Sequence, residues 1–562
     1  MKVHEIPYKR YTIEEGRAAF NAFKASCESA ACADDVIRAR EAFLAEMKNY
    51  EEAASLSNCR FTLDTRDEFY QAEMGYYDEN GPLFSELFTS YADLMLSSHF
   101  RAELESKLGS RRFKFFEIAK KSFSPEIIDD MQKENAVVTE YSKFMSELVF
   151  DYDGEKMPLA VLRGKLSDSD REVRKKAAYA VGKGLEAAEA QLDDIYDRLV
   201  KIRDTMAKKL GFENFIELGY YRMNRVDYNA EMVATFRENV KKYIVPCVTE
   251  LKKSIADELG IDTLMFYDDP IYVKGEVPRP KLNNDEIFVE AQKMYDEMSE
   301  HLGSFMRSMV ENEAFDVLSR DGKWGGGYCT CFPKEEQPFI LANFNGTSGD
   351  VDVITHEFGH AFAAKNVFTY GDEELGVGGM ETAECHSMSM EFLCHKGMDR
   401  FFSEPDKYRY SHLCGALSFI PYGVIVDEFQ HIAYEHPEYT PEERKAAYRE
   451  LEKKYRPYLS FEGIPYLEKG TRWQYQMHIY ETPFYYIDYC LAQTVALSFF
   501  KKSKEDYEGA LKSYIEFARK GGTKPFGELL ADADIPSPFA DGSLEGVAKK
   551  AIETAEKLKK SF

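Results

Sequence analysis

The stretch that most constrains this chain runs from Thr355 to Phe362 and reads THEFGHAF. The surrounding residues 350–367 contain no proline and begin with side chains that can cap a helix, so we predict a helix there. On a helix, His356 and His360 lie four positions apart on one face, where two imidazoles can bind the same metal ion. Glu357 points about 100° away from His356, so it can face a water on that metal without binding the metal itself. This spacing is typical of a zinc hydrolase site.

A third ligand is needed, because catalytic zinc usually takes three protein groups and leaves one position for water. A second helix is predicted from Met380 toward Arg400, after a glycine-rich loop, and Glu384 near its start is the best candidate. Glu381 and Glu391 recur on the same face and could accept a ring N–H from a ligand histidine, with Glu391 preferred. Ordinary solvated charge is the alternative for both of these carboxylates.

Cys385 and His386 flank the candidate ligand Glu384 in the sequence. Neighbouring positions on a helix point about 100° apart, so these side chains cannot share its direction. A fourth protein ligand would also close a catalytic zinc site. We therefore expect His386 to be a packing or pocket-wall residue and Cys385 to be at most a point of sensitivity to thiol reagents.

The third informative stretch, residues 473–489, reads WQYQMHIYETPFYYIDY. Its proline must break or kink any helix. Imidazole N–H and phenol O–H groups can stabilise the oxyanion that forms during peptide hydrolysis. Packing aromatics are the alternative, since the chain contains 36 tyrosines. The candidates from this stretch are His478, Tyr485, Tyr486 and Tyr489.

Together these three stretches resemble the thimet oligopeptidase and oligoendopeptidase F family of zinc metallopeptidases, most closely the branch with oligoendopeptidase F and the Pz-peptidases. The resemblance is close over residues 200–520 and looser before them. It implies a mainly α fold, a two-lobed helical ellipsoid with a deep substrate channel, and one Zn²⁺ per chain. The implied metal ligands are His356, His360 and Glu384.

The resemblance also implies that Glu357 is the general base and that His478, Tyr485, Tyr486 and Tyr489 form a substrate loop. The spacing from the histidine to the tyrosines differs slightly from that in the thimet branch. The identity of the oxyanion donor therefore stays open, and we favour Tyr486 and Tyr489.

Composition narrows the possible partners. A formal charge of −26 leaves no basic stripe to meet phosphates, which argues against nucleic acid. The longest apolar stretch, residues 413–426, is interrupted by Pro421 and is too short to span a bilayer. The first ten residues contain no apolar signal core, and ten irregularly spaced cysteines are typical of free thiols. We expect a soluble cytoplasmic protein of undetermined oligomeric state.

We predict an amino-terminal helical lobe over residues 1–200 that roofs the channel, and a catalytic lobe over 201–562. Residues 324–344 should form a hairpin, the core of a small β-sheet beside the zinc helix. Two more predicted strands cover residues 264–267 and 271–273, and a second hairpin surrounds the Asp-Gly turn at 153–154. Asn80-Gly81-Pro82 is interpreted as a break between helices. Capping boxes at residues 12–15 and 440–443 predict two helix starts.

These features favour a zinc-dependent oligoendopeptidase that cleaves internal bonds of short unfolded peptides. One alternative is a carboxypeptidase or dipeptidyl carboxypeptidase, which would need a cationic group for the terminal carboxylate. The other is a catalytically inactive helical peptide-binding protein. It is disfavoured because every named catalytic position carries a competent residue.

Overall fold

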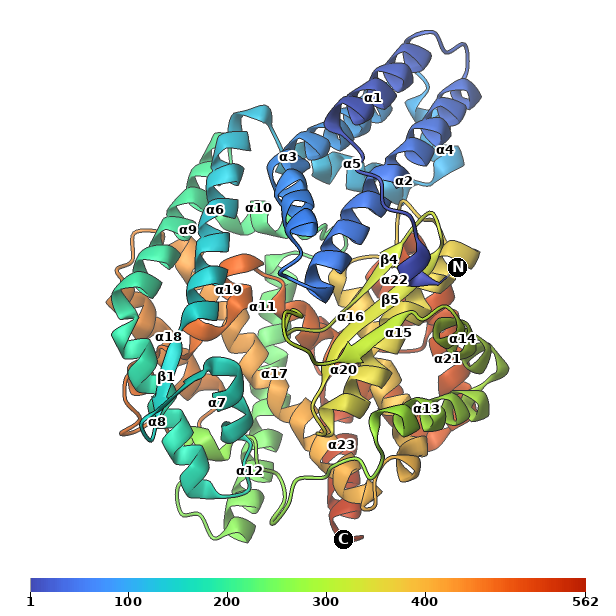
Figure 1. The fold of residues 1–562 in the computed structure, drawn as a ribbon. Coiled ribbons are helices and arrows are strands. Elements are labelled where there is room, and N and C mark those ends of the chain that lie inside the picture. The colour runs from blue at the N-terminus through green and yellow to red at the C-terminus, as the bar shows by residue number, and fades with distance from the viewer. Residues whose placement is uncertain (1) are drawn as a thin grey trace.

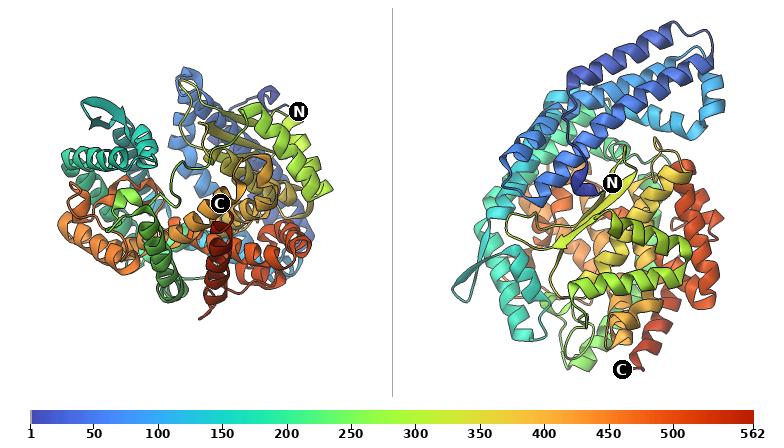
Figure 2. Two further views of the ribbon diagram at one scale, coloured as in Figure 1. Left: turned by 90° about the horizontal axis from the view of Figure 1, so that it is seen from below. Right: turned by 45° about the vertical axis from the view of Figure 1, so that its right-hand side comes forward.

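The computed structural model describes residues 2–562 of the chain, except for the side chain of Ala160. The fold is mainly helical, as predicted, with two small sheets (Figure 1). Five amino-terminal helices surround a small hydrophobic core of their own and project from the rest of the molecule (Figure 2). These helices are α1 (Ile13–Glu28), α2 (Ala33–Leu63), α3 (Glu68–Ser97), α4 (Arg101–Leu108) and α5 (Ser110–Ser122).

All later elements contribute to one large hydrophobic core. Its first part contains a β-hairpin and several long helices: α6 (Ile128–Glu147), β1 (Val149–Tyr152), β2 (Glu155–Pro158), α7 (Leu159–Leu166), α8 (Arg171–Ala187) and α9 (Glu189–Lys209). Next come α10 (Phe215–Arg222), α11 (Ala230–Asn239), α12 (Val245–Leu259), α13 (Asn284–Met298) and α14 (Glu300–Glu311). Residue 200 thus lies inside α9, and the smaller core spans only Tyr11 to Phe116.

The carboxy-terminal half carries the predicted metal helix, α15 (Gly349–Tyr370), and its partner α16 (Met380–Leu393). It continues with α17 (Pro405–Glu435), α18 (Pro441–Tyr455), α19 (Met477–Glu481), α20 (Tyr486–Glu505), α21 (Tyr507–Lys520), α22 (Phe526–Asp532) and α23 (Glu545–Lys559). Helices α16 and α20 pack against each other, and α15 packs on α16. Within residues 2–562, no helix combines the length and the apolar character that crossing a bilayer requires.

The predicted sheet beside the metal helix is present. It contains β3 (Phe315–Leu318), β4 (Tyr328–Phe332) and β5 (Gln337–Phe344), in the order β3-β5-β4. Strands β4 and β5 form the expected antiparallel hairpin, and β3 adds a parallel strand on the other side of β5. The chain passes from β5 through a short turn into α15, so the sheet lies directly beside the metal helix (Figure 1).

The second predicted hairpin and two capping boxes are also confirmed. Strands β1 and β2 pair around the Asp-Gly turn. Thr12 and Thr440 each cap their helix through reciprocal bonds with Glu15 and Glu443, respectively. These local motifs were predictable because the capping boxes join residues three positions apart and the hairpin pairs residues at most nine positions apart.

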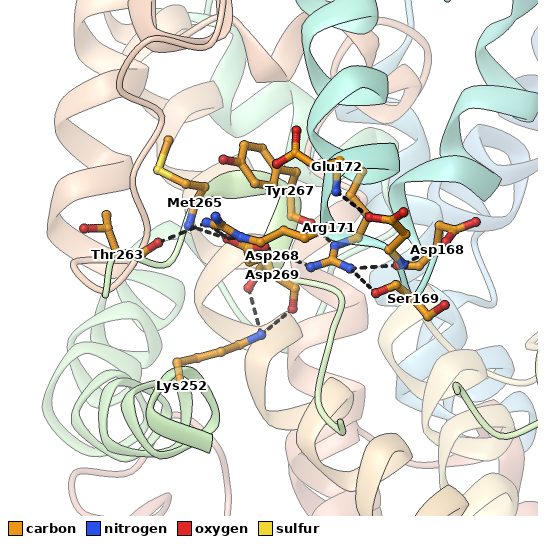
Figure 3. Close-up of polar contacts among 12 residues, drawn as sticks. Asp168, Ser169, Arg171, Glu172, Lys252, Thr263, Met265, Tyr267, Asp268 and Asp269 are labelled. Carbon is orange, nitrogen blue, oxygen red and sulfur yellow. Dashed lines mark hydrogen bonds and ion pairs between the residues drawn. The ribbon is translucent and has the colours of Figure 1, made fainter. Parts of the chain in front are cut away.

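The two strands predicted at residues 264–273 are wrong. This segment forms a loop with a single 3₁₀ turn, Phe266–Asp268. Its acidic residues bind side chains of flanking helices instead of pairing along a sheet (Figure 3). Asp268 forms salt bridges with Arg171 and Arg174 of α8 at 2.8 and 3.0 Å, and Asp269 forms one with Lys252 of α12 at 2.9 Å.

The predicted break at residues 80–82 is also wrong, since α3 continues through Pro82. A proline removes one helical hydrogen bond and usually ends or kinks a helix. Here Pro82 and Phe84 are buried, and α3 packs against α1, α2 and α5. Tertiary packing on three neighbouring helices therefore outweighs the local cost.

Candidate active site

The close approach of α15 and α16 builds the centre of the site. Gly359 lies in the contact between them, where an added Cβ would come within 2.6 Å of the backbone of His386 and Ser387. A larger side chain would therefore push the helices apart. The start of α15 is fixed by Asp350, whose carboxylate accepts the N–H groups of Asn345 and Gly346 at 2.9 and 2.7 Å.

This packing brings the three predicted metal ligands together. The Nε2 atoms of His356 and His360 lie 3.5 and 3.4 Å from Oε2 of Glu384, and the three ligand atoms lie within 4.8 Å of one another. Burial acts to raise the pKa of Glu384, but the two imidazoles hold that pKa well below its usual range. Two imidazole nitrogens and one carboxylate oxygen form a donor set that suits Zn²⁺.

Glu391 lies behind the predicted ligands. Its Oε1 lies 2.6 Å from Nδ1 of His356, a contact that orients the ring with Nε2 toward Glu384. Its Oε2 is 2.7 Å from Nε2 of His412, whose Nδ1 is 3.0 Å from Nε2 of His395. Although burial acts to raise it, the pKa of Glu391 falls to about 2 because of the bonds to His356 and His412.

Sequence reasoning missed this extension. His412 belongs to α17, so no spacing rule connects it with the metal helix. Only the packing of α17 beside α16 makes Glu391 a bridge between two histidines.

The side chain of Glu381 forms no hydrogen bond with the predicted ligands. The expectation that it could accept an N–H from His356 or His360 is therefore wrong. Among the described residues, Glu381 accepts hydrogen bonds from the Tyr228 hydroxyl at 3.5 Å and from the Thr382 hydroxyl at 3.0 Å. Burial raises the pKa of Glu381 to about 7, and the nearby Asp488 adds to this effect. At three residues before Glu384, the side chain of Glu381 has turned away from the imidazoles toward Tyr228, which precedes α11, and toward Asp488 of α20.

Glu357 lies on α15 beside the metal ligands, half-buried. Its Oε2 is buried and has no hydrogen-bond partner in the described part of the chain. A carboxylate oxygen held without a partner next to a metal-type donor set is free to accept a proton from water.

A strained turn at Phe484 sets the direction of the tyrosines that follow it. Pro483 separates α19 from α20, and Phe484 adopts a left-handed backbone with φ of 67°. This conformation is costly for a residue other than glycine. It is held by Gln430, whose Oε1 accepts the Phe484 N–H at 2.9 Å, and by Arg225, which donates to the Phe484 carbonyl.

Beyond this turn, Tyr485 and Tyr489 face the metal ligands. The Tyr485 hydroxyl donates to Oε1 of Glu384 at 2.7 Å, and the Tyr489 hydroxyl donates to that of Tyr485 at 3.0 Å. Tyr486 instead packs against Tyr422 and Phe419. Tyr485, and not Tyr486, therefore makes the hydrogen bond to the predicted ligand Glu384, since neighbouring side chains at the start of α20 point in different directions. Which tyrosine donates to the oxyanion stays a prediction.

His478 lies on α19 against the same tyrosines, with its ring centroid 5.0 Å from that of Tyr486 and 5.9 Å from that of Tyr489. Tyr422 donates to Oε1 of Gln476 at 2.6 Å, so the Gln476 amide nitrogen is the atom that donates to Nδ1 of His478, at 2.8 Å. The ring proton then lies on Nε2. Burial lowers the pKa of His478 to about 4 and keeps the ring neutral.

Cys385 and His386 point into the core, as expected for packing residues. Cys385 is fully buried, and His386 packs against Phe517 and Tyr514 of α21. Burial lowers the pKa of His386 to about 3. Neither belongs to the group of potential metal ligands.

Comparisons with known proteins identify the family of this chain. The model of peptidase family M3 matches residues 165–549, and the model of the peptidase M3 N-terminal domain matches residues 3–123. The chain belongs to peptidase family M3. The resemblance inferred from the three sequence stretches is thereby confirmed.

Similar M3 peptidases include curated proteins and a solved structure. The oligopeptidase PepF of Bacillus subtilis (strain 168) is 24% identical over 544 residues, which cover 86% of this chain and 75% of PepF. An oligoendopeptidase F homolog of Borreliella burgdorferi is 23% identical over 70% of this chain and 67% of its own length. A structure of Pz peptidase A with an inhibitor is 42% identical, with a TM-score of 0.94 over 99% of both chains. These M3 relatives support peptidase activity for this chain.

Proposed function

We propose that this M3 peptidase is a zinc-dependent oligoendopeptidase that hydrolyses internal bonds of short unfolded peptides. The observation that supports it most directly is the convergence of His356, His360 and Glu384 beside the partner-free oxygen of Glu357. The names of its relatives, oligopeptidase and oligoendopeptidase F homolog, favour short peptides as substrates.

His356, His360 and Glu384 would hold one Zn²⁺ per chain. When bound, this ion would act as a Lewis acid that lowers the pKa of water and polarises the peptide carbonyl. Glu391 keeps the His356 ring in the tautomer that presents Nε2 to the ion.

The chain's own residues would carry the proton and the developing charge. Glu357 accepts a proton from the attacking water at its free Oε2 and returns it to the leaving amine. The hydroxyls of Tyr485 and Tyr489 and the Nε2–H of His478 are the donors for the oxyanion. In the structure Tyr485 binds Glu384, so it must exchange this bond for the substrate oxygen. We keep the proposal that helices before residue 200 roof the substrate path.

A peptide blocked by acetylation and amidation tests this function. We expect cleavage at an internal bond, one zinc per chain by elemental analysis, loss of activity with a chelator and recovery with zinc. Glu357→Gln should retain zinc and lower kcat by roughly 10²–10⁴-fold, because the general base is lost. Glu311→Gln, at an exposed position on α14, is the matched control.

Two results would count against the proposal. Undiminished turnover by Glu357→Gln would remove the assigned base. Cleavage restricted to peptides with a free carboxyl end would instead favour the carboxypeptidase alternative, which needs a cationic group for that end.

A further inference from the structure

A cavity of about 360 Å³ borders residues 473–489, the catalytic segment that carries His478, Tyr485, Tyr486 and Tyr489. Its lining includes His478 and Tyr486, Arg163 of α7, and Arg472 together with Tyr422 and Tyr475. The Arg472 guanidinium, just before His478 in the sequence, and the guanidinium of the distant Arg163 therefore line the same cavity as the catalytic segment.

Arg472 is an unusual cation in this position. Its Nε and Nη1 atoms are buried without a hydrogen-bond partner, and it forms no salt bridge with any described residue. Its guanidinium lies 3.7 Å from the centroid of the Tyr422 ring and 5.9 Å from that of Tyr475. These aromatic faces hold the guanidinium in place without neutralising its charge.

The carboxylates near Arg472 are already engaged by other cations. Asp269, which also lines the cavity, binds Lys252 at 2.9 Å and also binds Arg456 (Figure 3 shows the Lys252 contact). Glu452 lies 3.4 Å from Arg456. Lys252 and Arg456 together thus bind both carboxylates, and Arg472 forms a salt bridge with neither of them.

Arg163 strengthens the positive character of the cavity. It is exposed, donates to the backbone carbonyl of Tyr475 at 3.2 Å and lies 5.7 Å from that ring. Although the net charge of the chain is −26, two arginines line one cavity beside its catalytic segment. A planar guanidinium matches the geometry of a carboxylate.

We propose that Arg472, assisted by Arg163, binds a carboxylate of the peptide substrate. Arg472 is therefore a specificity-determining residue of this enzyme. The carboxylate comes from the free carboxyl end of the peptide or from an acidic side chain close to that end. A free carboxyl end lies by definition on the side of the leaving amine. The inference rests on the proposed peptidase function, because the ligand is a substrate of that site.

Three forms of one N-acetylated peptide test the proposal. The first has a free carboxyl end and no acidic side chain, the second is amidated, and the third is amidated with glutamate as its last residue. We expect kcat/KM for a carboxylate-bearing form to exceed that of the plain amide by about tenfold or more, as for a hydrogen bond to a charged group. A gain for the first form identifies the carboxyl end, and a gain for the third identifies the side chain.

The variants then assign the preference to the cavity. Arg472→Gln should bring the ratio of kcat/KM between carboxylate and amide forms close to one, Arg472→Lys should retain part of it, and Arg163→Gln should reduce it. Arg307→Gln removes an exposed arginine of α14 and should leave the ratio unchanged. Equal kcat/KM for all three forms with the wild type would overturn the proposal, as would a ratio that Arg472→Gln leaves intact.

Failure of the pocket and failure of the peptidase function give different results. If the zinc-loaded wild type cleaves none of the peptides, the function fails, and calorimetric binding of the acid and amide forms still tests the pocket. If Arg472→Gln does not fold, the kcat/KM ratio of the wild type and that of the exposed Arg163→Gln variant show whether the cavity selects a carboxylate.

Discussion

The α15–α16 helix pair and the segment 472–489 build the same site in different ways. In the helix pair, His356 and His360 share a face through local spacing, and Gly359 lets the partner helix bring Glu384 close. In the segment, Tyr485 reaches Glu384 only because distant residues hold a left-handed turn at Phe484. The first geometry follows from helical periodicity, whereas the second depends on contacts across the fold.

Replacing a predicted ligand should give the largest effect and tests the helix pair directly. Glu384→Gln removes the charged oxygen between the two imidazoles, so we expect zinc affinity to fall by more than about 100-fold and activity to be lost with it. Competition with a chromophoric chelator measures the affinity. A variant with unchanged zinc affinity and activity would show that another group completes the site.

The tyrosine segment should affect turnover without affecting the metal. Tyr485→Phe removes one oxyanion donor, and we expect kcat to fall by roughly 10²–10³-fold while zinc remains bound. Tyr486→Phe is the matched control, because its ring packs against Phe419 and Tyr422 and its hydroxyl makes no hydrogen bond to a predicted ligand among the described residues. Its kcat should change much less. A larger loss of kcat in Tyr486→Phe would reverse the assignment.

A smaller effect is expected from the support behind the ligands. Glu391→Gln weakens the hydrogen bond that orients His356, so zinc affinity should fall by about 10–100-fold. Glu381→Gln, on the same helix but turned toward Tyr228, should leave zinc affinity unchanged. Equal losses in both variants would mean that α16 responds as a whole rather than through Glu391.

The smallest effect concerns stability and its dependence on pH. Because the folded pKa of Glu381 is raised to about 7, its ionisation opposes folding, and stability decreases as pH rises from about 4.5 to about 7. Glu381→Gln should therefore raise the free energy of unfolding by about 1–2 kcal/mol at pH 8 and by much less near pH 5. Urea unfolding at both pH values measures it, with Glu311→Gln as an exposed control. An equal increase in the free energy of unfolding at both pH values would contradict the raised pKa of Glu381.

Features governed by short-range hydrogen bonds or periodicity were predictable. The metal helix, its partner, both hairpins and the two capping boxes were all expected from residues within a few positions of one another. The strands expected at 264–273 failed because Asp268 and Asp269 bind cations of α8 and α12, which the local pattern does not reveal.

By itself, the sequence indicated the family, the mainly helical fold and the residues proposed to bind zinc, because helical spacing places His356 and His360 together wherever the helix lies. Only the tertiary structure decided that Tyr485 rather than Tyr486 faces Glu384, that Glu391 reaches His412, and that Arg472 lacks a salt-bridge partner. Each of these depends on which distant side chains pack together. Such long-range contacts leave no periodic signal in the sequence.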